Sequence, residues 1–512
     1  MSKFINYCAK NYFLSRKIHL QIIRKESVKY QHHWFRYLSS KGINTVFGND
    51  FGIHKNLSYY DFTQNIPLQD YNSLLPYIEN IEKGGQQILT QNSIKWLAKS
   101  SGTSDTKSKF IPVSKETLSI NNYVSAKDVL TTYCSLFPDT QLFSGRGLLL
   151  GGSFQPRPLP SSLPIGDISA ILLNYMPALT DLLRASTRKI LLCDDWNKKL
   201  KLLAQSTYNQ NITSLSGVPS WLFMVLKEVL NITHKTYIKE VWQHLELFMH
   251  GGVSFAPYKE EYNKLIGHEH TFFMNTYNAS EGFFGFQDQK EEEDLLLLTD
   301  NAVFYEFIPV NKVGDLNTKA IPLEEVKTRQ NYAIIITTAS GLWRYVIGDT
   351  LMFTSVNPYR FRITGRTTHY INAFGEEVII DNAEKALSKA CEATGSTFAD
   401  YTAAPHFAEE SNPNNCHEWL IEFITAPKDI SLFINALDSS LKQLNSDYEA
   451  KRTDNLLLSS PIVHQAKQGL FLSWLKTKNK LGGQYKVPRL QNDRKILNEL
   501  LIMNKKNITF VP

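Results

Sequence analysis

The sequence has few cysteines for its length and no long apolar run. Five cysteines are spread over 512 residues without a CxxC pair, so neither a disulfide framework nor a zinc ribbon is indicated. No segment approaches the ~20 apolar residues that a membrane-spanning helix needs. The N-terminal segment is interrupted by Lys3, Lys10, Arg16 and Lys17 and lacks the apolar core of a secretory signal. We therefore expect a cytoplasmic protein with no membrane partner.

A strong net charge is also missing. The 55 Lys and Arg residues stand against 49 Asp and Glu residues, which gives a formal net charge of +6. A nucleic-acid-binding protein would usually concentrate basic residues on one face, so we expect no nucleic-acid partner. The composition, with 43% hydrophobic residues, is that of a globular protein. At roughly 150 residues per domain, the length suggests two to four domains.

Two common nucleotide-binding fingerprints are incomplete. The Gly-Arg-Gly at 145–147 is followed by Leu150 where the dinucleotide fingerprint needs a third glycine. The segment SSGTSDTKSK at 100–109 lacks the second glycine of a Walker A loop. It nevertheless offers hydroxyls, backbone N–H groups and lysines between predicted strands at 94–98 and 110–113, and these donors can wrap a polyphosphate. The residues alone favour a phosphate-binding loop and an ordinary surface loop equally.

Apolar periodicity predicts a mixed α/β chain, with helices through the first hundred residues. The following part is predicted to contain helices over 220–231 and 236–247 and short strands over 146–151 and 189–193. Stretches rich in β-branched and aromatic residues predict hairpins that form a sheet or a small barrel, over 271–277, 302–308, 332–338, 342–347, 350–355 and 360–364.

The pattern changes again near 365–368, where we place the main domain boundary. Beyond it the sequence predicts a helix over 382–393 with Asp381 as its N-cap. A strand over 418–424 and a helix over 429–443 follow. These elements could form a compact α+β unit of the common domain size.

Two carboxylates follow predicted strands. Glu281 belongs to TYNASEG at 276–282, and Asp349 ends WRYVIGD at 343–349. A carboxylate at a strand end can bind Mg²⁺ or accept hydrogen bonds from ribose hydroxyls. Each feature taken alone is more typical of an ordinary strand terminus.

Taken together and in order, these segments resemble the adenylate-forming enzymes, and more narrowly the Gretchen Hagen 3 (GH3) auxin-responsive family of acyl acid–amido synthetases. SSGTSDTKSKFIP resembles the family's phosphate loop, TYNASEGFFG its TYASSE motif and WRYVIGD its YRVGD motif. LELFMHGGVSFAPY is similar to its glycine-rich adenine-side turn, and GRTTHYINAFGEEV with Glu384 is similar to its hinge. LNSDYEAKR and GGQYKVPR resemble its C-terminal signatures.

The motifs span about four hundred residues in the family's order, which makes the combined match specific although each motif is modest. Two departures stand out. Asp105 and Thr106 occupy positions where the family often has two glycines, and Asn278 and Ala279 replace Ala-Ser in the TYASSE motif.

The resemblance implies an α/β fold with a large N-terminal adenylation domain, residues 1–365, that contains sheets, helices and a small barrel-like part. It implies a smaller, mobile α+β C-terminal domain, residues 366–512. It also implies two half-reactions. A carboxylate attacks the α-phosphorus of Mg·ATP and releases pyrophosphate, and an amine then attacks the acyl carbon and releases AMP.

The same resemblance assigns residues to the two cofactors that it implies, ATP and Mg²⁺. Thr276 would approach the α-phosphate, Tyr277 would stack on adenine and Asp349 would accept from the ribose hydroxyls. Arg366 would reach the ribose or a phosphate. The remaining nucleotide-binding residues are Ser101, Gly102, Thr103 and Ser104 in the phosphate loop and Gly251 and Gly252 in the adenine-side turn.

Three residues are implied in catalysis. Glu281 would be the Mg²⁺ ligand, and Lys109 would neutralise the triphosphate. Lys486, in the QYKVPR signature after Gly482 and Gly483, would stabilise the charge that develops at the α-phosphorus. Outside the resemblance, Lys486 would be read as one solvated lysine among several neighbours.

The resemblance implies two substrates, a small carboxylic acid and an amine, which in most cases is an amino acid. We expect the protein to act as a monomer. Two alternatives stay open. An acyl-CoA ligase would share the adenylation step, although no segment suggests a CoA site. A non-catalytic nucleotide-binding protein would keep the fold without turnover, but Lys486, Glu281 and Asp349 argue against it. The sequence shows no general base for the amine.

Overall fold

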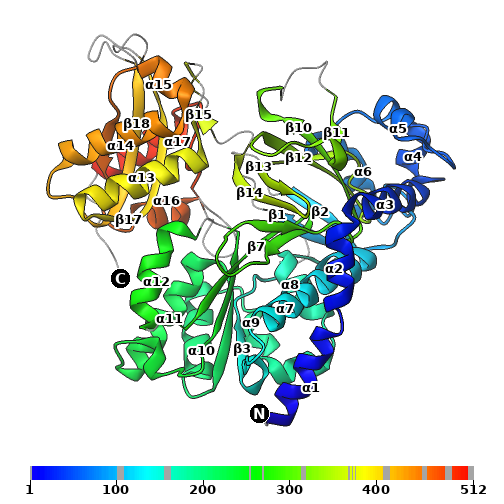
Figure 1. Cartoon of the computed structure of the whole chain (residues 1–512), viewed down its shortest axis with the longest axis horizontal. Helices are drawn as coiled ribbons and strands as arrows, with labels where there is room; N and C mark the ends of the chain where they lie inside the picture. The colour runs from blue at the N-terminus through cyan, green and yellow to red at the C-terminus, as the bar shows by residue number, and fades with distance from the viewer. Residues whose placement is uncertain are drawn as a thin grey trace.

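A computed structural model describes most of the chain (Figure 1). The described residues are 3–100, 109–154, 163–252, 255–267, 270–312, 319–366, 370–371, 373–374, 376, 378–407, 415–452, 458–478 and 487–505. None of the helices in these ranges is long and apolar enough to cross a membrane.

The sequence predicts helices in the first hundred residues, and within the described residues 3–93 six helices precede the first strand. Their starts follow local chemistry: Asp70 accepts from the backbone N–H of Ser73, and the Ser73 hydroxyl accepts from the Asp70 N–H, which forms a capping box. Ser58 caps the helix before it. The six are α1 (Lys3–Leu14), α2 (Lys17–Lys25), α3 (Ser27–Gly42), α4 (Val46–Asp50), α5 (Tyr59–Asn65) and α6 (Tyr71–Glu82).

One eleven-stranded sheet organises the larger part of the chain, in the order β11-β10-β12-β13-β14-β9-β8-β7-β6-β5-β3. Its parallel end consists of β3 (Arg146–Leu149), β5 (Ile212–Gly217), β6 (Leu247–Gly251) and β7 (Phe272–Ala279). Its antiparallel end consists of β8 (Gly282–Gln287), β9 (Leu295–Leu297), β10 (Val303–Pro309), β11 (Ile321–Pro322), β12 (Asn331–Thr338), β13 (Tyr345–Val356) and β14 (Tyr359–Arg366).

The hairpin strands therefore form, as predicted, but they belong to this common sheet and not to a separate barrel. Strand β12 is an unbroken run of buried residues from 332 to 338, because helix α3 packs on β10 and β12. The predicted strand over 342–347 begins late, at Tyr345. Arg344 before it has a φ of 43°, and the chain bends there before the strand begins.

A small three-stranded sheet carries the ends of the predicted phosphate loop. Strands β1 (Ile94–Ser100) and β2 (Lys109–Ser114) pair as a hairpin, and β4 (Ile165–Gly166) runs parallel to β1. Ser114 caps the following helical segment, because its hydroxyl accepts from the N–H of Thr117 at 3.1 Å. That segment is a π-helix, η1 (Thr117–Tyr123), which continues into α7 (Val124–Leu136).

Helices cover the parallel strands in the lower part of Figure 1. Trp242, Phe248 and Tyr262 are buried beneath them in one apolar cluster. The helices between the strands are α8 (Ile168–Tyr175), α9 (Arg188–Leu191), α10 (Trp196–Thr207), α11 (Pro219–Thr233) and α12 (Ala256–Ile266).

Two predictions in this region are wrong. The segment 236–247 forms one 3-10 turn, Ile238–Glu240, because the Glu240 carboxylate accepts from the N–H groups of Thr236 and Tyr237 and closes a turn. The segment 189–193 lies on the short helix α9 and not on a strand. A short apolar run fits a strand and a helical turn equally well, and here the Leu191 N–H bonds back to Thr187.

A smaller α+β unit follows and has apolar cores of its own, drawn in yellow to red in Figure 1. Its central sheet has the order β17-β18-β19. Its elements are β15 (Tyr370–Ile371), β16 (Val378–Ile379), α13 (Ile380–Thr394), β17 (Thr397–His406), β18 (Cys416–Thr425), α14 (Ile430–Leu444), α15 (Ser446–Arg452), β19 (Ile462–Gln465), α16 (Leu470–Thr477) and α17 (Lys495–Lys505).

The predicted helices and strand of this unit are present, with one correction. Helix α13 begins at Ile380, so Asp381 lies in its first turn and is not the N-cap. The Asn382 side chain accepts from the Ile379 N–H and satisfies that donor instead. Asp429 does cap α14, since its carboxylate accepts from the N–H groups of Ser431 and Leu432.

Candidate active site

At the carboxyl ends of β6 and β7, the predicted adenine-side turn lies beside the motif that resembles TYASSE. Gly251 and Thr276 are register partners in these parallel strands. A Cβ on Gly251 would lie 2.5 Å from the carbonyl oxygen of Thr276 and 2.7 Å from its hydroxyl, so only glycine fits there. Gly252 has a φ of 78°, which a residue with a side chain rarely adopts. In open α/β sheets this edge is where ligands bind.

His250 precedes Gly251 on β6, and sequence reasoning included it in the adenine-side motif without assigning it a role. Its imidazole is buried and stacks on Phe255 with the ring centroids 4.1 Å apart. Burial lowers the pKa of His250 to about 3, so the ring is neutral at physiological pH. The Thr276 hydroxyl donates to the His250 carbonyl at 2.9 Å, which fixes the hydroxyl against the end of β6.

Tyr277 and Asp349 meet in the interior of the site. The Tyr277 hydroxyl donates to Oδ2 of Asp349 at 2.6 Å, across 72 residues of sequence. The Tyr277 ring is 6% exposed and lies against Phe284 and Phe361, with centroids 5.1 and 6.0 Å away. Tyr277 therefore holds the Asp349 carboxylate in place, whereas its stacking on adenine stays a prediction.

A buried ion pair shapes the turn that leads to Asp349. The Arg344 guanidinium donates to Glu306, with its Nε 3.0 Å from Oε2 and its Nη2 2.9 Å from Oε1. The same guanidinium donates to the carbonyl oxygens of Thr63 and Ile66 at the end of α5. Sequence reasoning included Arg344 in a motif but assigned it no role, because its partner lies on another strand.

The β7–β8 turn carries Ser280 and Glu281, and both side chains are largely buried. The Ser280 hydroxyl donates to the Lys99 carbonyl at 3.3 Å, so this turn lies against the end of β1. Asn121 on η1 fixes the start of β8, because its side chain accepts from the Phe283 N–H at 2.7 Å and donates to the Phe283 carbonyl at 3.1 Å. Sequence reasoning missed Asn121.

Lys109 stands at the base of the predicted phosphate loop. It is the register partner of Ser100, so the two ends of the loop lie side by side. Its ammonium lies 5.7 Å from the centroid of the Tyr71 ring, and the Tyr71 hydroxyl accepts from the Phe110 N–H at 2.9 Å. The loop residues Ser101, Gly102, Thr103 and Ser104 lie outside the described residues.

The segment that follows Lys486 is anchored to the smaller unit, although Lys486 itself lies outside the described residues. The Thr402 hydroxyl of β17 donates to the Pro488 carbonyl at 2.7 Å, and the Ala403 N–H donates to the Arg489 carbonyl at 2.7 Å. The Arg489 guanidinium pairs with Glu384 of α13, which links the hinge motif to the QYKVPR signature.

Arg366 ends β14 as the register partner of Asp349, and its side chain lies outside the described structure.

A second anchored turn lies at the same sheet edge, after β3. The buried Lys199 ammonium donates to the carbonyl oxygens of Gly151 and Gly152. Asp167 Oδ2 accepts from the Ser153 N–H at 2.9 Å. Burial lowers the pKa of Lys199 to about 8. Neither Lys199 nor Asp167 was predicted, since each reads as an ordinary polar residue of a loop or helix.

Three family models match the chain in sequence order. The GH3 family N-terminal domain matches residues 18–271, the central domain residues 296–366 and the C-terminal domain residues 381–495. The chain belongs to the GH3 family.

Curated GH3 proteins of Arabidopsis thaliana match over nearly their whole length. "Probable indole-3-acetic acid-amido synthetase GH3.1" is 24% identical over 525 residues, which cover 88% of this chain and 87% of that protein. The 4-substituted benzoates-glutamate ligase GH3.12 is 20% identical over 520 residues, covering 86% and 88%. Among solved structures, the GH3.15 acyl acid amido synthetase superposes with a TM-score of 0.78 at 17% identity, covering 96% of this chain and 95% of that one. The GH3 fold is therefore shared along the chain.

The carboxylates at this site fit a magnesium ion that takes most of its ligands from the phosphates of a bound nucleotide. Among the described residues, no three His, Cys, Asp or Glu side chains converge to bind a metal. Mg²⁺ usually takes one or two carboxylates and completes its shell with substrate phosphates and water. One largely buried carboxylate, that of Glu281, fits this requirement.

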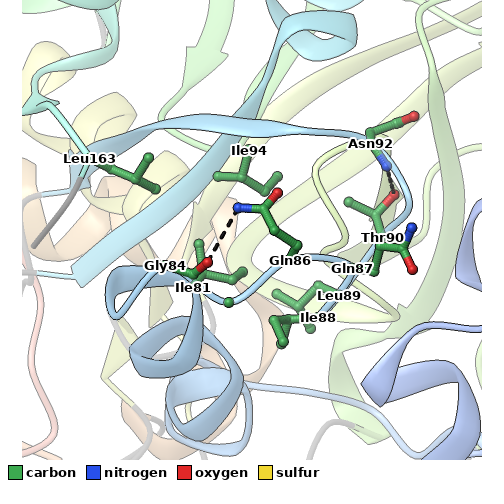
Figure 2. A pocket seen from close by; sticks show the side chains of 11 residues that line it. Ile81, Gly84, Gln86, Gln87, Ile88, Leu89, Thr90, Asn92, Ile94 and Leu163 are labelled. Atoms are coloured by element: carbon green, nitrogen blue, oxygen red, sulfur yellow. Dashed lines mark hydrogen bonds between the residues drawn. The ribbon is translucent and has the colours of Figure 1, made fainter.

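A cavity elsewhere in the GH3 chain is too small to be a substrate site (Figure 2). It has a volume of about 30 Å³, room for little more than a water molecule. In Figure 2 the Gln86 amide points across it to the Gly84 carbonyl, a distance of 3.3 Å. Its wall is the 84–92 turn that precedes β1 together with Ile81, Ile94 and Leu163.

Proposed function

We propose that this GH3 chain is an ATP-dependent acyl acid–amido synthetase, which activates a small carboxylic acid as its acyl-adenylate and transfers the acyl group to an amine. The observation that carries the proposal is the Tyr277–Asp349 hydrogen bond beside the Gly251–Thr276 contact. It joins three sequence motifs of the family into one site at the carboxyl edge of the sheet. The relatives named as amido synthetases and as a ligase support the reaction class.

In the first half-reaction, the residues at this edge of the sheet and the phosphate loop bind and orient ATP. The Asp349 carboxylate, which Tyr277 holds in place, accepts from a ribose hydroxyl in this proposal. The Gly251–Gly252 turn allows close approach of the base, and the Thr276 hydroxyl lies beside it. Lys109 offsets part of the triphosphate charge and the loop residues 101–104 donate hydrogen bonds to it, since nucleotidyl transfer depends mainly on positioning and charge stabilisation.

Glu281 is the proposed Mg²⁺ ligand, and the bound ion would neutralise charge on the phosphate oxygens. The Ser280–Lys99 hydrogen bond supports this role, because it places the Glu281 turn against the strand that enters the phosphate loop. Lys486 is proposed to stabilise the negative charge that builds up on the α-phosphoryl group as pyrophosphate leaves. The anchored segment 487–491 gives its loop a fixed base.

The second half-reaction forms an amide bond as the amine attacks the acyl carbon and AMP leaves. For the two substrates we propose only a chemical class, a small carboxylic acid and an amino acid. Relatives named for indole-3-acetic acid and for 4-substituted benzoates make aromatic acids the first to test. Action as a monomer in the cytoplasm stays a prediction.

Isotope exchange between pyrophosphate and ATP tests the adenylation step. A panel of carboxylates that includes indole-3-acetate and 4-hydroxybenzoate is scored for acid-dependent exchange. We expect Lys486→Ala to reduce that exchange about tenfold or more, a loss of ~1.4 kcal/mol. Lys480→Ala, six residues away, is the matched control and should leave it unchanged. Exchange that is unaffected by Lys486→Ala would remove Lys486 from the mechanism.

A further inference from the structure

Helices α1 and α2 expose large apolar side chains to solvent. Phe4, Tyr7 and Ile18 are 73%, 63% and 71% exposed, and Ile22 is 42% exposed. In Figure 1 the two helices follow one another along the margin of the larger unit, away from the smaller one. Such a stretch of exposed apolar surface commonly marks an interaction site.

Within each helix the two side chains share one side, because Phe4 and Tyr7 are three residues apart on α1 and Ile18 and Ile22 are four residues apart on α2. Ser15 and Arg16 separate the two helices. We call this surface, with Lys17 and Lys25 beside it, the α1–α2 face.

The opposite side of α1 is already anchored, so the α1–α2 face is not the side that the fold covers. Asn6 donates to the Thr140 carbonyl at 3.0 Å and accepts from the Phe143 N–H at 3.0 Å. Phe13 stacks on Phe143 with centroids 5.0 Å apart. The helix is therefore held rigidly while the exposed side stays available to a partner.

The charge of this segment has a single sign. Residues 3–25 contain no aspartate or glutamate, and their basic residues are Lys3, Lys10, Arg16, Lys17, Arg24 and Lys25. Arg16 pairs with Asp128 and Arg24 pairs with Asp288, while Lys10 donates to a backbone carbonyl. Lys3, Lys17 and Lys25 are exposed. Their charge complements an anionic partner.

We propose that the α1–α2 face lies on an anionic lipid surface, with its aromatic and aliphatic side chains at the headgroup boundary and its lysines on the phosphates. This combination of apolar side chains with flanking lysines is typical of helices that lie in the membrane interface. A symmetric contact between two copies would bring like charges together, which disfavours self-association. This proposal departs from the sequence-based expectation of no membrane partner, which rested on the absence of a spanning segment and of a secretory signal.

Vesicle co-sedimentation of the full chain tests the proposal. We expect binding to vesicles of equal parts phosphatidylcholine and phosphatidylglycerol, and little binding to phosphatidylcholine alone. The binding should weaken as salt is raised, because the lysines act through screened charge. The triple variant Phe4→Ser/Ile18→Ser/Ile22→Ser should weaken it about tenfold or more. Replacing Lys17 and Lys25 by Gln should cost about fivefold for each lysine.

Matched controls come from exposed residues elsewhere. Tyr60, Leu182 and Ile502 are 67%, 61% and 56% exposed, and their combined Ser variant should bind vesicles as the unmodified chain does. Thermal unfolding checks that both triple variants stay folded. No binding to anionic vesicles would overturn the proposal, as would equal binding to neutral vesicles or equal loss in the control. Dimerisation that only the α1–α2 variant abolishes would assign this face to a second copy and would also overturn it.

Discussion

The Tyr277 hydroxyl lies 2.6 Å from Oδ2 of Asp349, so the end of β7 and the start of β13 share one hydrogen bond at the centre of the site. Both residues belong to motifs that are separately weak. Their contact joins the two motifs by one hydrogen bond and gives each buried polar group a partner. Asp349 needs a donor to fix its carboxylate, and Tyr277 needs an acceptor for a buried hydroxyl.

Tyr277→Phe is expected to raise the KM for ATP about five- to tenfold, because it removes one hydrogen bond to a buried carboxylate. Pyrophosphate exchange at varied ATP measures the change. Tyr305→Phe is the control, since Tyr305 is a buried tyrosine whose hydroxyl is hydrogen-bonded to Asn301. This substitution should change stability without changing the KM for ATP. An unchanged KM for ATP in Tyr277→Phe would separate this hydrogen bond from nucleotide binding.

Glu281→Gln is expected to lower the exchange rate about a hundredfold or more, because the amide cannot replace the carboxylate as a Mg²⁺ ligand. Raising the Mg²⁺ concentration should recover part of the loss. The exposed Glu291, ten residues away, provides the matched variant Glu291→Gln, which should behave like the unmodified chain. A Glu281→Gln enzyme with normal rate and normal Mg²⁺ dependence would show that the metal is bound elsewhere.

Arg344→Met is expected to destabilise the larger unit by about 3–5 kcal/mol, because it leaves the Glu306 carboxylate buried without its main cationic partner. Urea unfolding measures this loss. Adding Glu306→Gln to Arg344→Met should recover part of the stability. The exposed pair Lys264–Glu260 is the control, and Lys264→Met should cost under about 1 kcal/mol. If Arg344→Met and Lys264→Met lost the same unfolding free energy, a special role for the buried position of Arg344 would be contradicted.

His250 should make stability depend on pH below its unfolded pKa of 6.5. Above that pH the imidazole is neutral in both states and contributes no pH dependence. As the pH falls from 6.5 towards about 3, the unfolded chain binds a proton that the folded chain does not, so stability is lost. We expect about 1.4 kcal/mol per pH unit well inside this window. His250→Phe should lose less stability between about pH 8 and pH 5.5 than the unmodified chain, and an identical loss would contradict this assignment.

Local chemistry made much of the fold predictable. The runs at 302–308 and 332–338 coincide with β10 and β12 to within a residue, because both strands are rich in buried β-branched and aromatic residues. The helix predicted over 429–443 forms at Ile430–Leu444, where Asp429 caps it. The helix predicted over 236–247 does not form, although the segment has apolar residues at helical spacing. Its last residues, Glu246 and Leu247, instead lie beside Thr213 at the start of a sheet strand.

The site was less predictable than the fold, because its contacts cross long stretches of sequence. The motifs identified Tyr277 and Asp349 but not their hydrogen bond. Arg344 needs Glu306, 38 residues away, and Asn121 needs Phe283, 162 residues away. Neither pairing has a local signature. Lys199 was missed because its partners are backbone carbonyls, which no side-chain pattern reveals.

The central claim is that the acyl group of the acyl-adenylate is transferred to an amine with release of AMP, and product analysis by mass spectrometry tests it most directly. The full chain is incubated with Mg·ATP and an acid that supports exchange, then with either a mixture of amino acids or CoA. We predict an N-acyl amino acid, formed in equal amounts with AMP, and no acyl-CoA. Formation of acyl-CoA without any amide, or no AMP under either condition, would contradict the account.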